Sequence, residues 1–89
     1  MEDVEANSKP FTQMDGHTVY VYRHKGKFAL WVKINGIRYI TTMYDAKKHS
    51  ADNIFYGSYT PIAGHLYKKN PSFHELVDTM IRYPHTHDL

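Results

Sequence analysis

The stretch HTVYVYRHKGKFALWVKINGIRYITTMY, residues 17–44, decides the fold. Apolar and polar residues alternate through it, and Lys25-Gly26 and Asn35-Gly36 interrupt the alternation. Asn-Gly is the strongest short-range signal for a two-residue hairpin, because both residues tolerate the positive φ angles of a type I′ turn. The stretch therefore predicts a three-stranded antiparallel meander, with strands over about 17–24, 27–34 and 37–44.

The register of this meander follows from counting outward from the two turns. The predicted partners are Ile34–Ile37, Val32–Tyr39, Leu30–Thr41, His24–Lys27, Tyr22–Ala29 and Tyr20–Trp31. Because successive side chains of a strand point to opposite faces, the sheet sorts into two unlike surfaces. The core face carries Val19, Val21, Phe28, Leu30, Val32, Ile34, Ile37, Tyr39 and Met43. The opposite face, which we call the aromatic face, is rich in aromatic and basic residues and has no acidic residue. It carries Tyr20, Tyr22, His24, Lys27, Trp31, Lys33, Arg38, Ile40, Thr42 and Tyr44.

Two helices are predicted after the sheet. The first spans 46–56 with Asp45 as its N-cap, and a loop with a fourth short strand near 53–59 is the alternative. The second spans 71–83, and it begins either at Pro71 after an Asn70 cap or at a Ser72–Glu75 capping box. Its apolar stripe at i, i+3, i+4, i+7 spacing is Phe73, Leu76, Val77 and Met80. Residues 60–70 between the helices are expected to form a loop or a brief extended segment.

The expected organisation is one small α+β domain over 1–89, with the helices packed on the core face of the sheet. Residues 1–10 are expected to form a flexible N-terminus, and residues 84–89 an exposed tail. The chain has no cysteine, its N-terminus lacks the apolar segment of a signal peptide, and no run is long enough to span a membrane. These features predict a soluble protein of the cytoplasm.

The aromatic face is the candidate binding site. Flat aromatic side chains stack on bases, while Lys and Arg contact phosphates or base edges. Five Lys or Arg residues and no acid lie between Gly16 and Tyr44, although the whole chain has a net charge of only +2. The predicted binding residues are Tyr20, Tyr22, Lys25, Lys27, Trp31, Lys33, Arg38, Thr42, Tyr44 and Lys47. The alternative is a second small core, in which Tyr20, Trp31, Ile40 and Tyr44 lie beneath the N-terminal segment or the loop 57–70.

Three short motifs carry a resemblance to known DNA-binding domains. Gly26-Lys27-Phe28 opens the second strand, Asn35-Gly36-Ile37-Arg38 forms the second turn, and Tyr44-Asp45-Ala46-Lys47-Lys48 leads into the helix. Over about residues 18–57 the chain resembles the three-strand-plus-helix domain of plant ethylene-response-type factors and the arm-type domain of phage and transposon integrases. The resemblance implies that the sheet reads the DNA major groove while the helix packs behind it. The chain departs from the pattern in having few arginines and an additional C-terminal helix.

Catalytic chemistry is not expected. The chain has no cysteine, no Gly-x-Ser-x-Gly motif and no glycine-rich phosphate loop. His85, His87 and Asp88 could offer metal ligands, but two exposed histidines without a third ligand bind metal weakly, so no metal and no cofactor is predicted.

Two functions remain open from the sequence. The first is binding of duplex DNA through the aromatic face. The second is a protein-binding module that uses the same tyrosine- and tryptophan-rich surface, of the kind that phages and mobile elements use to inhibit a host enzyme or defence system. A homodimer through that face is possible in both cases, and no membrane contact is expected.

Overall fold

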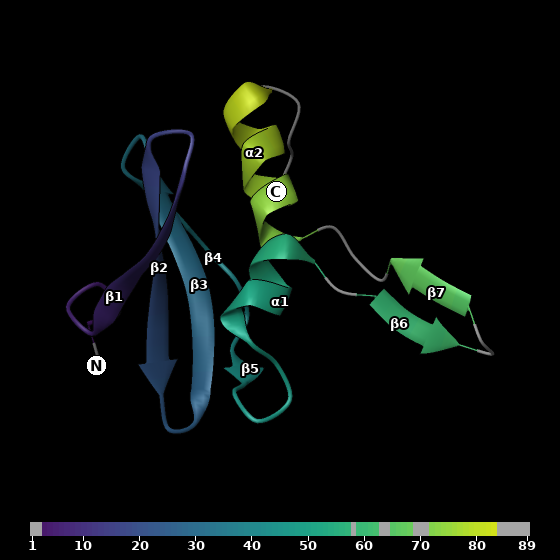
Figure 1. Cartoon of the computed structure of the whole chain (residues 1–89). Coiled ribbons are helices and arrows are strands. Elements are labelled where there is room, and N and C mark those ends of the chain that lie inside the picture. Colours follow the sequence, from purple (N-terminus) through teal and green to yellow (C-terminus); the bar gives the residue numbers. More distant parts are fainter. Residues whose placement is uncertain (1–2, 58, 63–64, 69–71, 84–89) are drawn as a thin grey trace. The chain divides into compact units, whose positions relative to one another are not determined.

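The computed structural model describes residues 3–57, 59–62, 65–68 and 72–83. The chain divides into two compact units, Met1–Ala51 and Asp52–Leu89. The first unit holds five strands, β1 (Ser8–Met14), β2 (His17–His24), β3 (Lys27–Ile34), β4 (Ile37–Ile40) and β5 (Tyr44–Asp45) (Figure 1). The following elements are α1 (Ala51–Tyr56), β6 (Tyr59–Ile62), β7 (His65–Lys68) and α2 (Phe73–Arg82). The α+β class predicted from the sequence is confirmed.

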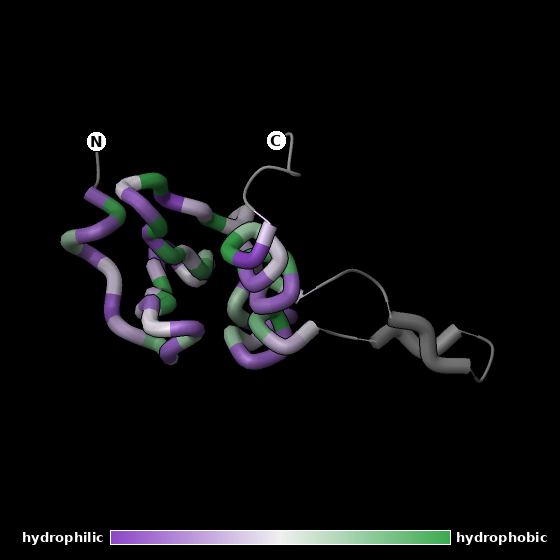
Figure 2. Tube along the Cα trace, turned by 90° about the horizontal axis from the view of Figure 1, so that it is seen from above, coloured by the Kyte–Doolittle hydropathy of each residue, from purple (hydrophilic) through white to green (hydrophobic). Residues whose placement is uncertain are grey.

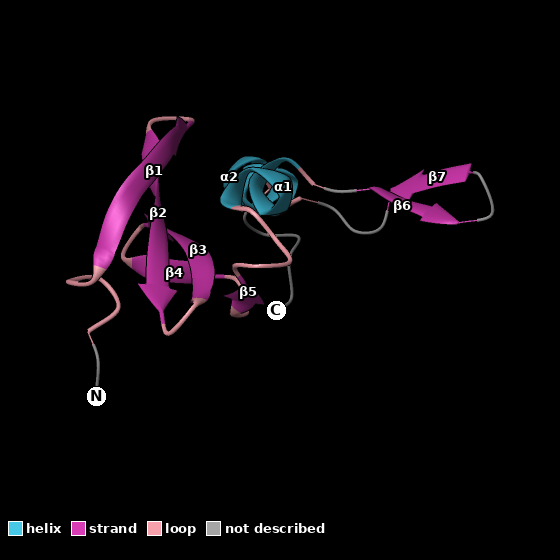
Figure 3. Ribbon diagram, turned by 60° about the horizontal axis from the view of Figure 1, so that its bottom comes forward, coloured by secondary structure: helices cyan, strands magenta, loops and turns pink. Residues whose placement is uncertain are grey.

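Three two-residue turns build the sheet of the first unit. Asp15-Gly16, Lys25-Gly26 and Asn35-Gly36 all have positive φ angles at both positions, between 47° and 80°. Type I′ turns require this backbone, whose twist matches that of the flanking strands. The strands follow in the order β1-β2-β3-β4, and Figure 3 shows them as neighbours with the short β5 beside β3. The predicted pairs of β2 with β3, and Ile34–Ile37 and Val32–Tyr39 of β3 with β4, are confirmed.

The strand β1 was not predicted. It pairs antiparallel with β2 from Ser8 opposite Tyr22 to Met14 opposite His17. Residues 8–10, expected in a flexible terminus, therefore begin a strand. The register shifts between Pro10 and Thr12, as in a β-bulge, and Phe11 lies at this shift. The sequence-based pattern missed β1 because its alternation is weak and it contains a proline.

The predicted strand 37–44 is interrupted. The Thr41 amide donates to the Leu30 carbonyl at 2.9 Å, and the Leu30 amide donates to the Thr41 Oγ1 at 3.0 Å. Beyond that point β5 pairs Tyr44 with Phe28, where an unbroken ladder would place Met43. One inserted residue moves every later side chain to the opposite face. The placement of Tyr44 on the aromatic face is therefore wrong, and its ring lies 5.8 Å from that of Phe28 on the core face.

Residues 46–50 are not helical. Asp45 instead closes a turn, in which its carboxylate accepts the Lys47 amide at 2.9 Å and its carbonyl accepts the amides of Lys48 and His49. α1 is thus shorter than the predicted 46–56, and the alternative of a strand near 53–59 is wrong for the helical residues 53–56. The segment 60–70 was predicted as a loop or a brief extended segment, and its residues 60–62 and 65–68 lie in the paired antiparallel strands β6 and β7.

The C-terminal helix follows the sequence pattern closely. Ser72 is its N-cap, and the Ser72 hydroxyl accepts the Glu75 amide at 3.0 Å. This confirms the Ser72 start, while Asn70, Pro71 and the tail 84–89 lie outside the described residues. Packing of the helices on the core face of the sheet stays a prediction. No helix in the described part of the chain is long and apolar enough to cross a membrane.

The middle of β3 is buried on both sides. Phe28, Leu30 and Val32 belong to the core face, and Ala29 and Trp31 belong to the aromatic face, yet each is at most 3% exposed. Figure 2 shows hydrophobic and hydrophilic residues interspersed along the trace of the first unit. A strand that is buried on both faces has a continuous apolar sequence, as FALWV, residues 28–32, has here. The centre of the aromatic face is consequently not open to solvent.

Candidate nucleic-acid interface

Trp31 forms the centre of a small second core. Its ring stacks on Tyr20, with centroids 4.5 Å apart and planes inclined by 19°. Its indole N–H donates to the Ser8 hydroxyl at 2.8 Å. Trp31 is 3% exposed and Tyr22 is 7% exposed, whereas Tyr20 is half-buried. The expectation of an open aromatic surface is therefore wrong for Trp31 and Tyr22. The alternative of a second core holds for Trp31 and the half-buried Tyr20, but it is wrong for the exposed Ile40 and for Tyr44, which lies on the core face.

The N-terminal turn that precedes β1 brings an acidic residue to this face. The Asp3 carboxylate accepts the amides of Glu5 at 3.0 Å and Ala6 at 3.3 Å. Both oxygens of the Glu5 carboxylate lie 3.4 Å from Lys33 Nζ, and its Oε2 lies 3.6 Å from Arg38 Nη1. The aromatic face is thus not free of acids, because the sequence-based list considered only residues 17–44.

Five basic residues lie close together along the backbone at the other end of the sheet. We call them the basic end, and they are Arg23, Lys25, Lys27, Lys47 and Lys48. Lys25 lies in the β2–β3 turn, Arg23 and Lys27 lie in the strands beside that turn, and the turn after β5 carries Lys47 and Lys48. The two turns are adjacent, because Asp45 pairs with Lys27 and the Ala46 amide donates to the Gly26 carbonyl at 3.0 Å.

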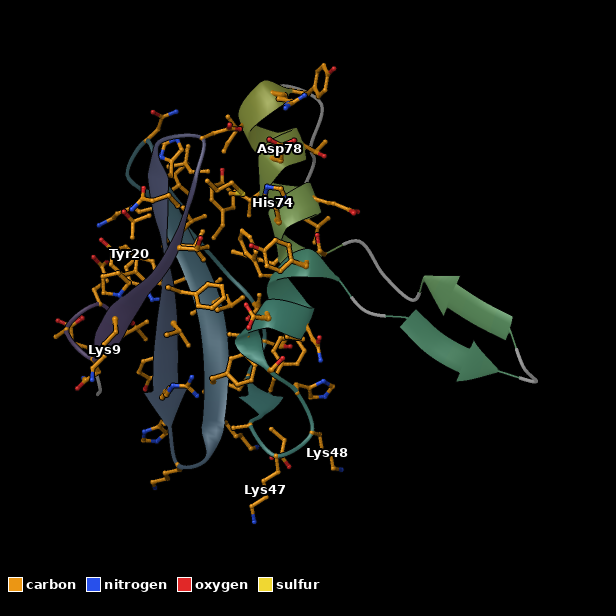
Figure 4. The ribbon with its side chains drawn as sticks, viewed as in Figure 1. Lys9, Tyr20, Lys47, Lys48, His74 and Asp78 are labelled. Carbon is orange, nitrogen blue, oxygen red and sulfur yellow. The ribbon has the colours of Figure 1, made fainter. Side chains whose placement is uncertain are left out.

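All five side chains of the basic end are exposed. Figure 4 shows Lys47 and Lys48 projecting outward at the end of the sheet that carries the β2–β3 turn. The Arg23 guanidinium lies 5.8 Å from the centroid of the Phe28 ring, which steadies its position. One acidic residue, Asp45, lies in the two segments 23–27 and 45–48. The segments carry five positive charges and one negative charge, which makes the basic end a concentrated source of positive potential.

Two histidines flank the basic end. The His24 ring lies parallel to that of Tyr22, with centroids 6.2 Å apart. The His49 ring meets that of Tyr44 edge-on at 5.3 Å. Tyr44 is therefore a support for the turn that presents Lys47 and Lys48, since it also contacts Phe28 on the core face.

The structure separates the predicted binding residues into distinct groups. Lys25, Lys27 and Lys47 come together in the basic end. Lys33 and Arg38 lie on the aromatic face and pair with Glu5. Thr42 is exposed between β4 and β5. The prediction missed Arg23 and Lys48, although the run Lys47-Lys48 was a signal for the latter; no local signal points to Glu5.

No cluster of potential metal ligands occurs among the residues that the structure describes. The candidate His85, His87 and Asp88 lie outside them.

No family model matches the chain, and neither a curated protein nor a solved structure matches it. The function is therefore inferred from the chemistry of its own surface.

Proposed function

We propose that this chain is a non-catalytic protein that binds nucleic acid, with duplex DNA as the preferred ligand and the basic end as the contact surface. The observation that carries the proposal is that Lys25, Lys27, Lys47 and Lys48 are all exposed on two chain segments that are hydrogen-bonded to each other. Two separate chain segments supply these four exposed ammonium groups. The fold brings the segments together, so the basic surface does not arise from a single run of lysines in the sequence.

The charge distribution favours a phosphate backbone as the partner. The whole chain has a net charge of +2, and the basic end alone holds more positive charge than that, so the remainder is net negative. Such an asymmetric molecule approaches DNA with one end foremost. Ammonium groups on flexible stems contact phosphates as point charges and release condensed counterions. The resemblance of residues 18–57 to three-stranded DNA-binding domains supports the same class of ligand.

The contacts of the basic end are directed at the backbone and not at base edges. Lysine-to-phosphate contacts fix the position of a protein on the duplex but carry no sequence information. The buried Trp31 and Tyr22 are not available for stacking on bases in this conformation. We therefore expect binding that depends weakly on sequence and strongly on salt.

The salt dependence of binding to a labelled generic duplex tests the proposal. With about five phosphate contacts, the logarithm of the affinity should fall with the logarithm of the salt concentration with a slope of about −4.5. Lys47→Gln should reduce the steepness by about 0.9, because it removes one contact. Lys9→Gln, an exposed lysine of β1, is the matched control and should leave the slope unchanged. Equal effects of the two variants, or no binding at low salt, would refute the proposal.

The open edge of the sheet supports a second candidate, a protein-binding module. β4 pairs with β3 on one side and is the last strand in the order of the described sheet. Because the Thr41 amide points toward β3, the amides of Arg38 and Ile40 point away from it. Ile37 and Ile40 are 56% and 44% exposed. An extended segment of a partner protein can add to such an edge by main-chain hydrogen bonds, as an inhibitor of a host enzyme would require.

Ile40→Pro tests this second candidate. The substitution removes an outward amide without removing a hydrogen bond to β3, and edge strands tolerate proline. A partner protein that wild type recovers and Ile40→Pro does not would favour strand addition. Recovery of the same protein by both would exclude the β4 edge as the interface.

A further inference from the structure

Lys33 and Arg38 are an unusual pair for a β-sheet. They are direct partners across β3 and β4. The Thr41 amide donates to the Leu30 carbonyl, so Leu30 and Thr41 form a hydrogen-bonded pair. Hydrogen-bonded and non-hydrogen-bonded pairs alternate along an antiparallel ladder. Lys33 and Arg38 lie three positions further along and therefore form a non-hydrogen-bonded pair. In such pairs the side chains approach most closely, and like charges directly opposite each other are destabilising. An anion between the two cations offsets this repulsion.

Glu5 supplies that anion in the free protein. Its carboxylate lies within 3.4 Å of the Lys33 ammonium and within 3.6 Å of the Arg38 guanidinium. The three side chains remain 38–47% exposed, so solvent and other anions reach them. Glu5 belongs to the turn over residues 3–7, whose bonds to the Asp3 carboxylate are themselves exposed. A carboxylate held in this way can be exchanged for another anion.

We propose that Lys33 and Arg38 form a phosphate-binding site, which the Glu5 carboxylate occupies in the free protein and a nucleic-acid phosphate occupies in the complex. The proposal rests on the proposed function and adds a second contact region to the basic end. Glu5 is thus a built-in competitor of the ligand, and its displacement accompanies binding.

The surroundings prepare the site for phosphate. The Arg38 guanidinium lies 6.0 Å from the centroid of the Trp31 ring, and Trp31 is fixed in turn by Tyr20 and by the Ser8 hydroxyl. A guanidinium placed in this way presents its fork of N–H donors to two phosphate oxygens. Phosphate bridges the two cations as the Glu5 carboxylate does, so the exchange never leaves the two positive charges facing each other.

The substitution Glu5→Gln tests whether the Glu5 carboxylate competes with the ligand for the site formed by Lys33 and Arg38. The variant keeps the size of the side chain and removes its charge, so the affinity for duplex DNA at low salt should rise about tenfold, which corresponds to the loss of two exposed ion pairs. The salt slope should stay as in wild type, because Lys33 and Arg38 contact phosphate in both complexes. Asp15→Asn is the matched control: it also removes one negative charge from the first unit, and Asn-Gly preserves the type I′ turn. It should not produce the tenfold gain in affinity.

A second measurement uses inorganic pyrophosphate in place of DNA. In Glu5→Gln, NMR titration should shift the indole resonance of Trp31 and the amides of Lys33 and Arg38. Lys33→Gln combined with Glu5→Gln should abolish these shifts and also the gain in DNA affinity. The dispersion of the remaining amide resonances verifies that each variant is folded.

The outcomes separate this inference from the proposed function. DNA binding by wild type, with Glu5→Gln and Asp15→Asn alike in affinity, would overturn the inference and leave the basic end as the interface. Pyrophosphate shifts at Lys33 and Arg38 without DNA binding by any variant would support the phosphate site and overturn the proposed function. Pyrophosphate shifts together with the tenfold gain for DNA would support both and identify a backbone phosphate as the ligand.

Discussion

At the scale of single residues, Lys25 stands out among the turn positions. The first residues of the three turns, Asp15, Lys25 and Asn35, have φ angles of 47°, 50° and 52°. Asn and Asp adopt this left-handed conformation readily because their short polar side chains bond locally, whereas lysine gains no such bond. Lys25 therefore makes its turn less stable, and its positive charge at the basic end explains why a lysine lies at this position. Local rules are most often broken where a residue serves binding.

Lys25→Asn should therefore have opposite effects on stability and on binding. The free energy of unfolding should rise by about 0.5 kcal/mol, because asparagine suits the left-handed position better. The affinity for duplex DNA should fall, and the salt slope should lose about 0.9. Urea denaturation and DNA titration measure the two effects. Lys25→Gln, which removes the charge without improving the turn, should weaken binding with no gain in stability; a gain in that variant would contradict this explanation.

Ser8→Ala tests how the N-terminal segment is attached to Trp31. The buried indole N–H would lose its acceptor, which should lower the free energy of unfolding by about 1–3 kcal/mol. In a Trp31→Phe background, where no indole N–H exists, the same substitution should cost less than half as much. Urea denaturation of the four proteins gives the coupling. Equal losses in both backgrounds would mean that the hydrogen bond does not hold the segment.

The sequence predicted the basic residues better than the fate of the aromatic ones. Lys25, Lys27 and Lys47 were identified because charge concentrated in the middle of the chain is a local property. The buried Trp31 is hydrogen-bonded to Ser8, which is far from it in the sequence and belongs to a segment without a clear pattern. Residue composition therefore identifies a positively charged surface, while the parts of it that are covered depend on tertiary contacts.

At the scale of elements, the hairpins were predictable and the strand ends were not. Two-residue turns fix the register of both neighbours, so the pairs of β2 with β3 followed by counting. β5 pairs one residue out of that register, since the chain inserts a residue after Thr41. Nothing in the run Thr41-Thr42-Met43 distinguishes a bulge from regular strand by alternation alone. The face assigned to Tyr44 was wrong for this reason.

Thr41→Val tests what joins β3 to β4 at the bulge. The Thr41 hydroxyl accepts the Leu30 amide, and Leu30 is fully buried, so an isosteric valine leaves an unpaired buried N–H. We expect a loss of about 1–3 kcal/mol in the free energy of unfolding and faster hydrogen exchange of the Leu30 amide. Thr42→Val is the matched control: the exposed neighbour should tolerate valine with little change. Identical stabilities of the two variants would contradict a structural role of this hydroxyl.

At the scale of the whole molecule, the two edges of the main sheet differ. On β1 the outer edge carries Lys9, Pro10 and a bulge at Phe11, which are common devices against strand pairing. On β4 the short edge carries two exposed isoleucines, Ile37 and Ile40. The chain thus offers one edge that accepts a further strand and one that resists it, among the strands the structure describes.

Self-association should for this reason stop at the dimer. Two copies can join β4 edges about a twofold axis, and the β1 edges then close the assembly instead of extending it. Sedimentation at increasing protein concentration should show a monomer–dimer equilibrium that Ile40→Lys abolishes. Leu76→Lys, which changes a similarly exposed apolar side chain of α2, should not affect it. Trimers or open-ended oligomers would contradict the difference between the edges.

The succession of three two-residue turns also bears on how quickly the chain folds. Every strand from β1 to β4 pairs with its neighbour in sequence, so each pairing closes only a very short loop. Proteins with such local contacts cross their folding barrier faster than sandwiches or parallel sheets of similar size. Each hairpin can form as soon as its second strand has been synthesised, and the first unit can therefore assemble progressively while the rest of the chain is still being made.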